Sequence, residues 1–126
     1  MDSERRKILS ALCHGAIFFS VTNIVSIVIP IVIILLTDDS IVKDNAKESI
    51  NFHINIYIYA LVFGILIWFG WRFPFNGIIS FVLFPFGIPL LVLLAIFAVV
   101  MAIIAIINVK NNPNQPYRYP FIFHLL

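Results

Sequence analysis

Long uncharged stretches dominate the pattern of polar and apolar positions along this chain. Three stretches contain no Asp, Glu, Lys or Arg: residues 8–37, 49–71 and 73–109. Each is longer than the roughly 18 apolar residues that a helix needs to cross a bilayer. Helices satisfy their own backbone hydrogen bonds in lipid. The pattern therefore predicts an all-α integral membrane helix bundle, a single domain over residues 1–126, with spans at residues 10–36, 49–71 and 88–108.

The third stretch is too long for one span and is interrupted by Pro85-Phe86-Gly87-Ile88-Pro89. Our first interpretation is three crossings, with residues 74–87 as a short interfacial or re-entrant helix. The alternative is a fourth, partial crossing before Pro85. Three spans divide the basic residues evenly between the two sides, whereas four divide them six to two, which the positive-inside rule favours. In either case we place the basic N-terminus in the cytoplasm.

Helix start and stop signals refine the predicted elements. The first helix should run from about Glu4 to Leu36 and bend at Pro30, which removes a backbone donor. Asp39 or Ser40 can cap the next helix, which should begin near Ile41. The tail, residues 110–126, is amphipathic and aromatic, so we expect it to lie on the membrane surface or against the bundle.

A polar stripe enters the second predicted span. At spacings of three and four, its members share one helix face: Asp44, Glu48, Asn51, Asn55 and Tyr59. Carboxamides inside hydrocarbon commonly hydrogen-bond to another helix. We therefore interpret the stripe as interhelical. The alternative is a polar pathway, but two amides at the outer end of a span do not make a pore.

Composition agrees with the membrane class. Hydrophobic residues make up 62% of the chain and charged residues 11%, with a mean hydropathy of +1.07; a soluble globular domain has about 25% charged residues. The net charge of +2 comes from scattered basic residues, so we expect no nucleic-acid partner. The lipid bilayer is the first predicted partner.

The side chains that could take part in catalysis or metal binding form no recognisable site. Asp38, Asp39, Asp44 and Glu48 could gather a cation, but the regular spacing and glycine of a calcium loop are missing, so capping and headgroup contacts are favoured. Cys13 and the three histidines have no ligand-pair spacing. No nucleophile–base motif is present, and no carboxylate lies inside a span, which disfavours a coupled transporter. We expect no catalytic residue, metal or cofactor.

Two short elements carry a family resemblance: Ala46–Phe52 (AKESINF), entering the second span, and the segment YRYP after the last span. The residues that carry it are Asn51, Phe52, Tyr117, Arg118, Tyr119 and Pro120. The chain resembles a small bacterial membrane-protein family of unknown function. That family is distantly similar to the Tic twenty-kilodalton family of chloroplast import components. The resemblance implies a multi-pass protein of the bacterial inner membrane.

From these observations we expect a non-enzymatic membrane protein. It should be a self-associating bundle, a homo-oligomer, or a subunit or adaptor of a larger complex with other membrane-protein subunits. The alternative implied by the resemblance is a Tic-like translocation or conduction component.

Overall fold

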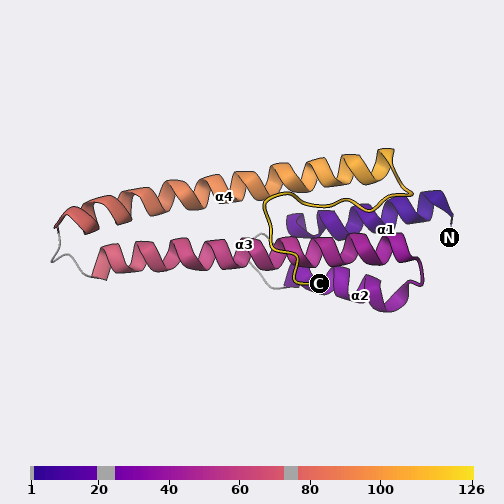
Figure 1. Cartoon of the computed structure of the whole chain (residues 1–126), viewed down its shortest axis with the longest axis horizontal. Coiled ribbons are helices and arrows are strands. Elements are labelled where there is room, and N and C mark those ends of the chain that lie inside the picture. Colours follow the sequence, from indigo (N-terminus) through magenta and orange to yellow (C-terminus); the bar gives the residue numbers. More distant parts are fainter. Residues whose placement is uncertain (1, 20–24, 73–76) are drawn as a thin grey trace. The chain divides into compact units, whose positions relative to one another are not determined.

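The computed structural model describes residues 2–19, 25–72 and 77–126, and within these ranges every regular element is helical. The all-α prediction is confirmed. In chain order the elements are α1 (Ser3–Gly15), the 3₁₀ helix η1 (Ala16–Phe19), α2 (Val25–Leu36), α3 (Ser40–Arg72) and α4 (Gly77–Asn111), followed by a non-helical tail (Figure 1).

Two helices in the described part of the chain are long and apolar enough to cross a membrane: Ser40–Arg72 and Pro85–Asn111. The prediction of three or four such helices was wrong. The difference lies in the first predicted span, residues 10–36. Its apolar second half, Ser26–Leu36, is shorter than a span.

The first uncharged stretch does not form one helix. α1 ends at Gly15, η1 follows, and α2 begins at Val25. α1 and α2 contact each other, and the side chain of Arg6 in α1 reaches Asp39, just beyond α2, at 2.8 Å. The two helices are therefore a hairpin whose ends meet. Residues 20–24, where the sequence also predicted helix, lie outside the described residues.

Packing explains why the hairpin is preferred to a straight helix. Cys13 of α1, Ile33 of α2, and Val42 and Ala46 of α3 form one buried apolar cluster. A straight helix would carry Cys13 and Ile33 about 30 Å apart, at 1.5 Å per residue. Glycine at position 15, where α1 ends, also has a weak helix propensity.

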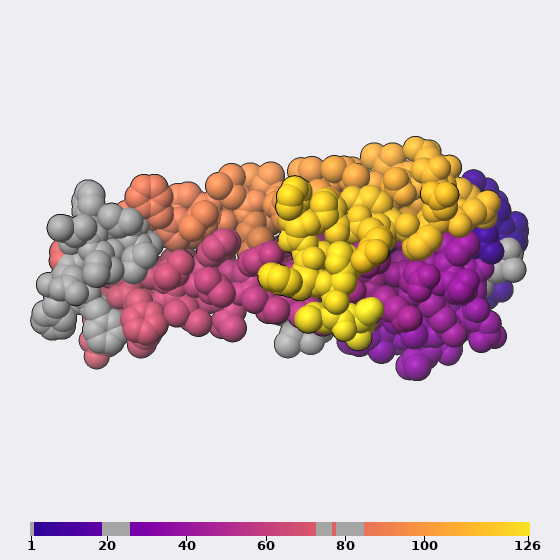
Figure 2. Space-filling view, in the orientation of Figure 1, coloured from indigo at the N-terminus to yellow at the C-terminus, as the bar shows by residue number. Residues whose placement is uncertain are grey.

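The chain divides into two compact units, residues 1–55 with 98–126, and residues 56–97. In the first unit, α1 and α2 lie beside the start of α3, and the tail returns along α3 after α4 (Figure 1). The space-filling view shows the yellow tail lying across the helices of this unit (Figure 2). The predicted position of the tail against the bundle is the one observed.

In the second unit, α3 and α4 approach closely at Gly87. A Cβ atom placed there would lie 2.2 Å from Cγ1 of Ile67. α4 continues through Pro85 and Pro89, where the sequence predicted a break. Proline removes one backbone donor but is tolerated in apolar helices when the surroundings compensate. Residues 74–76 of the predicted interfacial segment lie outside the described residues.

Candidate functional site

One face of α3 in the first unit buries polar side chains. Asn45, Asn51 and Asn55 are each 1% exposed, and Glu48 is 9% exposed. Buried polar groups are almost always hydrogen-bonded, because losing water without a new partner costs free energy. We call this face, Asn45, Glu48, Asn51 and Asn55, the amide face; its hydrogen bonds run mainly to the C-terminal tail.

Asn55 binds the backbone of Phe123 twice. The Phe123 N–H donates to Oδ1 of Asn55 at 2.9 Å, and Nδ2 of Asn55 donates to the Phe123 carbonyl oxygen at 2.8 Å. One side chain thus satisfies both backbone groups of one residue, as a neighbouring strand would. The contact depends on the backbone of the tail and not on the phenyl ring.

Asn51 holds the end of the tail. Its Oδ1 accepts the N–H groups of Leu125, at 3.0 Å, and Leu126, at 2.9 Å. Asn51 and Asn55 together bind four backbone groups of the last four residues of the tail.

Glu48 also binds the tail, at two of its residues. One carboxylate oxygen, Oε2, accepts the Tyr119 N–H at 3.1 Å and lies 3.2 Å from Nε2 of His124. The carboxylate therefore fixes two points of the tail, five residues apart.

His14 joins α1 to both α3 and the tail. Its Nδ1 lies 2.8 Å from the Tyr119 hydroxyl, and its Nε2 lies 2.9 Å from Oδ1 of Asn45. Nδ2 of Asn45 donates to Ser10 Oγ and to the Ile41 carbonyl oxygen, so Oδ1 must be the acceptor. Nε2 of His14 therefore carries a hydrogen, and Nδ1 accepts from Tyr119.

The ring of Tyr119 packs inside the unit. It stacks on Phe52, with centroids 4.1 Å apart and planes 6° apart, and the residue is 2% exposed. Burial raises the pKa of the Tyr119 hydroxyl well above its usual value, with a smaller contribution from nearby Tyr117 and Glu48. The hydroxyl therefore stays protonated and remains a donor to His14.

The structure places the residues of the two sequence elements as follows. Phe52 and Tyr119 are in contact, Asn51 binds the tail, and Tyr117 N–H donates to Asn45 Oδ1 at 2.9 Å. Arg118 and Pro120 are exposed. The AKESINF and YRYP elements, remote in sequence, therefore form one contact.

The remaining stripe residues behave differently. Asp44 is exposed, and Tyr59 is half-buried in the second unit. The sequence analysis did not identify His14 and Asn45 as partners of the tail. Asn45 lies three residues before Glu48, so a spacing of three at that turn, in place of the four that selected Asp44, would have included it.

A second cluster ties three segments together at one end of the first unit. The Arg6 guanidinium bonds to Oδ2 of Asp39 at 2.8–2.9 Å and to Oδ1 of Asn114 at 2.7 Å. Oδ1 of Asp39 accepts the N–H groups of Ile41 and Val42, so Asp39 caps α3 as one of the two predicted candidates.

These contacts set the charge of Asp39. Burial opposes ionisation, but the hydrogen bond from Arg6, its positive charge and the two capping N–H groups outweigh burial and lower the pKa of Asp39. The carboxylate is therefore ionised throughout the physiological pH range.

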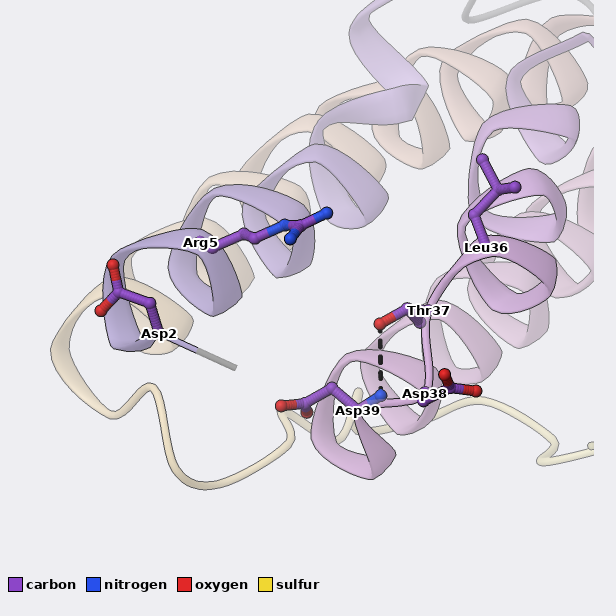
Figure 3. A pocket seen from close by; sticks show the side chains of 6 residues that line it. All are labelled: Asp2, Arg5, Leu36, Thr37, Asp38 and Asp39. Carbon is purple, nitrogen blue, oxygen red and sulfur yellow. Dashed lines mark hydrogen bonds between the residues drawn. The ribbon is translucent and has the colours of Figure 1, made fainter.

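The neighbouring pocket has a volume of about 490 Å³ and is lined by Asp2, Arg5, Leu36, Thr37, Asp38 and Asp39 (Figure 3). In Figure 3 the carboxylates of Asp38 and Asp39 point in opposite directions. Within the described ranges no group of three or more His, Cys, Asp or Glu side chains could hold a metal ion.

Comparison with known proteins identifies the family. A family model, described as the magnetosome magnetite crystal formation protein family, matches residues 5–126. The chain belongs to this family. Its members are bacterial, in keeping with the small bacterial family that the sequence elements indicated, but the comparisons give no support to a Tic relationship.

No curated protein and no solved structure matches the chain in these comparisons. Family membership and the two apolar helices together support a membrane location.

Proposed function

We propose that this protein is a non-enzymatic, multi-pass membrane protein that acts as a structural subunit of a larger membrane assembly. The family description connects that assembly with magnetite crystal formation in magnetosomes. In this proposal the protein shapes or organises the membrane around the crystal, as a homo-oligomer or with other membrane-protein subunits, and carries out no chemical step itself.

The proposal rests on what the buried polar groups bind. Asn45, Glu48, Asn51 and Asn55 each bind the backbone of the chain's own tail. A catalytic or conducting site would instead direct such groups toward a substrate or a water-filled cavity. Side chains committed to the chain's own backbone favour a rigid structural subunit.

We further propose two membrane crossings, by α3 and α4, with both termini on one side. Support comes from Arg6, which binds Asp39 before α3 and Asn114 after α4. The start of α3 and the end of α4 therefore lie at the same end of the first unit. The α1–α2 hairpin would enter the membrane from that end without crossing it.

The distribution of basic residues supports an orientation. Seven of the eight lie near the end marked by Arg6, in α1, the start of α3, the end of α4 or the tail: Arg5, Arg6, Lys7, Lys43, Lys47, Lys110 and Arg118. The eighth, Arg72, is at the opposite end of α3. The positive-inside rule places the first group, and so both termini, in the cytoplasm.

The test is complementation in a magnetosome-forming bacterium that lacks its own member of the family. Expression of this chain should restore the size distribution of magnetite crystals, measured by electron microscopy. The double variant Asn51→Leu/Asn55→Leu, whose tail is released, should restore it poorly, whereas Asp44→Leu on the exposed part of the same helix should match the unmodified chain.

Membrane insertion is checked in the same cells by carbonate extraction. If the unmodified chain is inserted and the crystals still match those of the deletion strain, the proposed role in crystal formation is wrong. If both variants restore crystal size equally, the tail contacts are irrelevant to the role.

A further inference from the structure

A groove on the first unit lies between α1 and the last turns of α4. It has a volume of about 440 Å³. Its walls are apolar or small over most of their length, and charged side chains stand at one end. The lining residues are Glu4, Lys7, Ile8, Ala11, Leu12, Gly15, Ile106 and Lys110.

Two small residues of α1 line the groove, Ala11 and Gly15. Ala11 and Gly15 are one helical turn apart on α1, so they share a face. A Cβ atom at Gly15 would lie 3.5 Å from Cδ1 of Ile106, in ordinary contact. A larger side chain at either position would therefore occupy the groove, and the native residues keep it open.

The mouth of the groove carries a net positive charge. Lys7 and Lys110 contribute two ammonium groups and Glu4 contributes one carboxylate, which leaves one positive charge. Nζ of Lys7 lies 2.8 Å from Oε1 of Glu4, and that pair is exposed. Lys110 therefore supplies the charge that a bound anion would neutralise.

The apolar part of the groove covers most of one leaflet of a bilayer. From Ile8 to Gly15 the helix advances 7 residues, or about 10 Å at 1.5 Å per residue, against about 15 Å for half of the hydrocarbon core. An acyl chain lying there with its anionic headgroup at the mouth has the arrangement of a membrane lipid.

We propose that this groove binds one anionic glycerophospholipid, with an acyl chain along Ile8, Leu12 and Ile106 and the headgroup phosphate at Lys7 and Lys110. The inference rests on the membrane insertion proposed above. With the basic end in the cytoplasm, the lipid comes from the inner leaflet, where anionic headgroups are attracted by lysines near the surface.

The test is native mass spectrometry of the full-length protein in detergent, titrated with phosphatidylglycerol or with phosphatidylcholine of the same acyl chains. The unmodified protein should bind one phosphatidylglycerol molecule about fivefold more tightly than phosphatidylcholine, since a lysine near the surface contributes on the order of 1 kcal/mol. Lys110→Gln should abolish this preference. Lys43→Gln, which removes a lysine outside the groove, should leave it unchanged.

A second pair of variants tests the acyl chain. Ala11→Phe and Gly15→Leu should fill the groove and lower the affinity for both lipids, while the matched change Gly64→Leu, at a glycine with open space around it, should not. Folding of each variant is checked by its thermal melt in detergent, and if one variant does not fold, the other decides.

Three results would overturn the proposal: equal binding of the two lipids by the unmodified protein, no bound lipid, or undiminished binding by a folded, groove-filling variant. Carbonate extraction of the same protein from membranes tests insertion separately. A protein that is inserted but shows no lipid preference would refute this site and leave the proposed function standing.

Discussion

Asn55 illustrates how a single side chain can serve an irregular segment. Its amide offers one acceptor and two donors, and the structure uses both kinds on the Phe123 backbone. An apolar side chain of similar size would leave two part-buried backbone groups without these partners. The free-energy cost of such a loss is about 1–3 kcal/mol per group.

We expect Asn55→Leu to lower the stability of the tail contact by about 2 kcal/mol or more. The loss should appear as faster digestion of the C-terminus by carboxypeptidase and as a lower midpoint of thermal unfolding in detergent. Asp44→Leu, on the same helix but exposed, is the control and should change the midpoint little. Equal digestion of the two variants would show that Asn55 does not hold the tail.

Asp39 combines a helix cap with an ion pair, and its pKa is lowered. A carboxyl group whose pKa is lower in the folded state stabilises that state above its unfolded pKa, about 3.9. That stabilisation is lost as the pH falls through the lowered folded pKa. We therefore expect the stability difference between the unmodified protein and Asp39→Asn to be constant at neutral pH and to shrink below about pH 4.

The measurement is a series of thermal melts in detergent between pH 3 and pH 7. Asp38→Asn is the matched control, because its carboxylate is exposed and points away from Asp39 (Figure 3). If Asp39→Asn and Asp38→Asn have the same pH profile, the Arg6 contact contributes nothing to stability.

At the scale of elements, the tail is the unusual part of this fold. It has no regular secondary structure after Asn111, yet Tyr119 is among the most buried large side chains. Its position depends on two kinds of contact: hydrogen bonds that Tyr119 donates to His14 of α1 and Glu48 of α3, and stacking of Tyr119 on Phe52.

A graded series at Tyr119 separates these contacts. Tyr119→Phe keeps the stacked ring but leaves the buried Nδ1 of His14 without its donor, so it should cost about 1–3 kcal/mol. Tyr119→Ala also removes the ring and should cost about 3–5 kcal/mol. Thermal or denaturant unfolding in detergent would measure both, and equal losses would mean that the stacking contributes nothing.

The pairing of α3 and α4 in the second unit depends on Gly87. A methyl group there would meet Ile67 at 2.2 Å, and Ile67 is stiff because it is β-branched. We expect Gly87→Ala to destabilise this pairing by about 1–3 kcal/mol, the usual range for overpacking. The double variant Gly87→Ala/Ile67→Ala should recover part of the loss.

Gly64→Ala is the control for that prediction. No atom lies within 4 Å of a Cβ atom at Gly64, and alanine favours a helix by about 0.5–1 kcal/mol over glycine. Gly64→Ala should therefore raise the unfolding midpoint slightly while Gly87→Ala lowers it. A rise in both would refute the close contact at Gly87.

At the scale of the whole molecule, the testable feature is the number of crossings. With Cys13 replaced by alanine, cysteines introduced at Ser3, Gln115 and Gly77 can be labelled from one side of sealed vesicles. We expect Ser3→Cys and Gln115→Cys to react from the same side and Gly77→Cys from the other. Reaction of Ser3→Cys and Gln115→Cys from opposite sides would restore an odd number of crossings.

Part of this architecture could be predicted from the sequence. The uncharged stretches predicted helices, and Asp39 was identified as a possible cap of α3, because both depend on interactions within a few residues. The prediction of a helix break at Pro85 and Pro89 was wrong, because α4 continues through both. Local propensity was overridden there by the surrounding helix.

The sequence by itself determined the class of protein: apolar helices, a polar face at the start of α3 and a charged end. Only the tertiary structure decided that α1 and α2 fold back as a hairpin and that the tail reaches the amide face. The physical reason is separation along the chain. His14 and Tyr119 are 105 residues apart, and Asn55 and Phe123 are 68 apart. Periodicity records which face of a helix is polar, but the partner of that face is chosen by packing between distant segments.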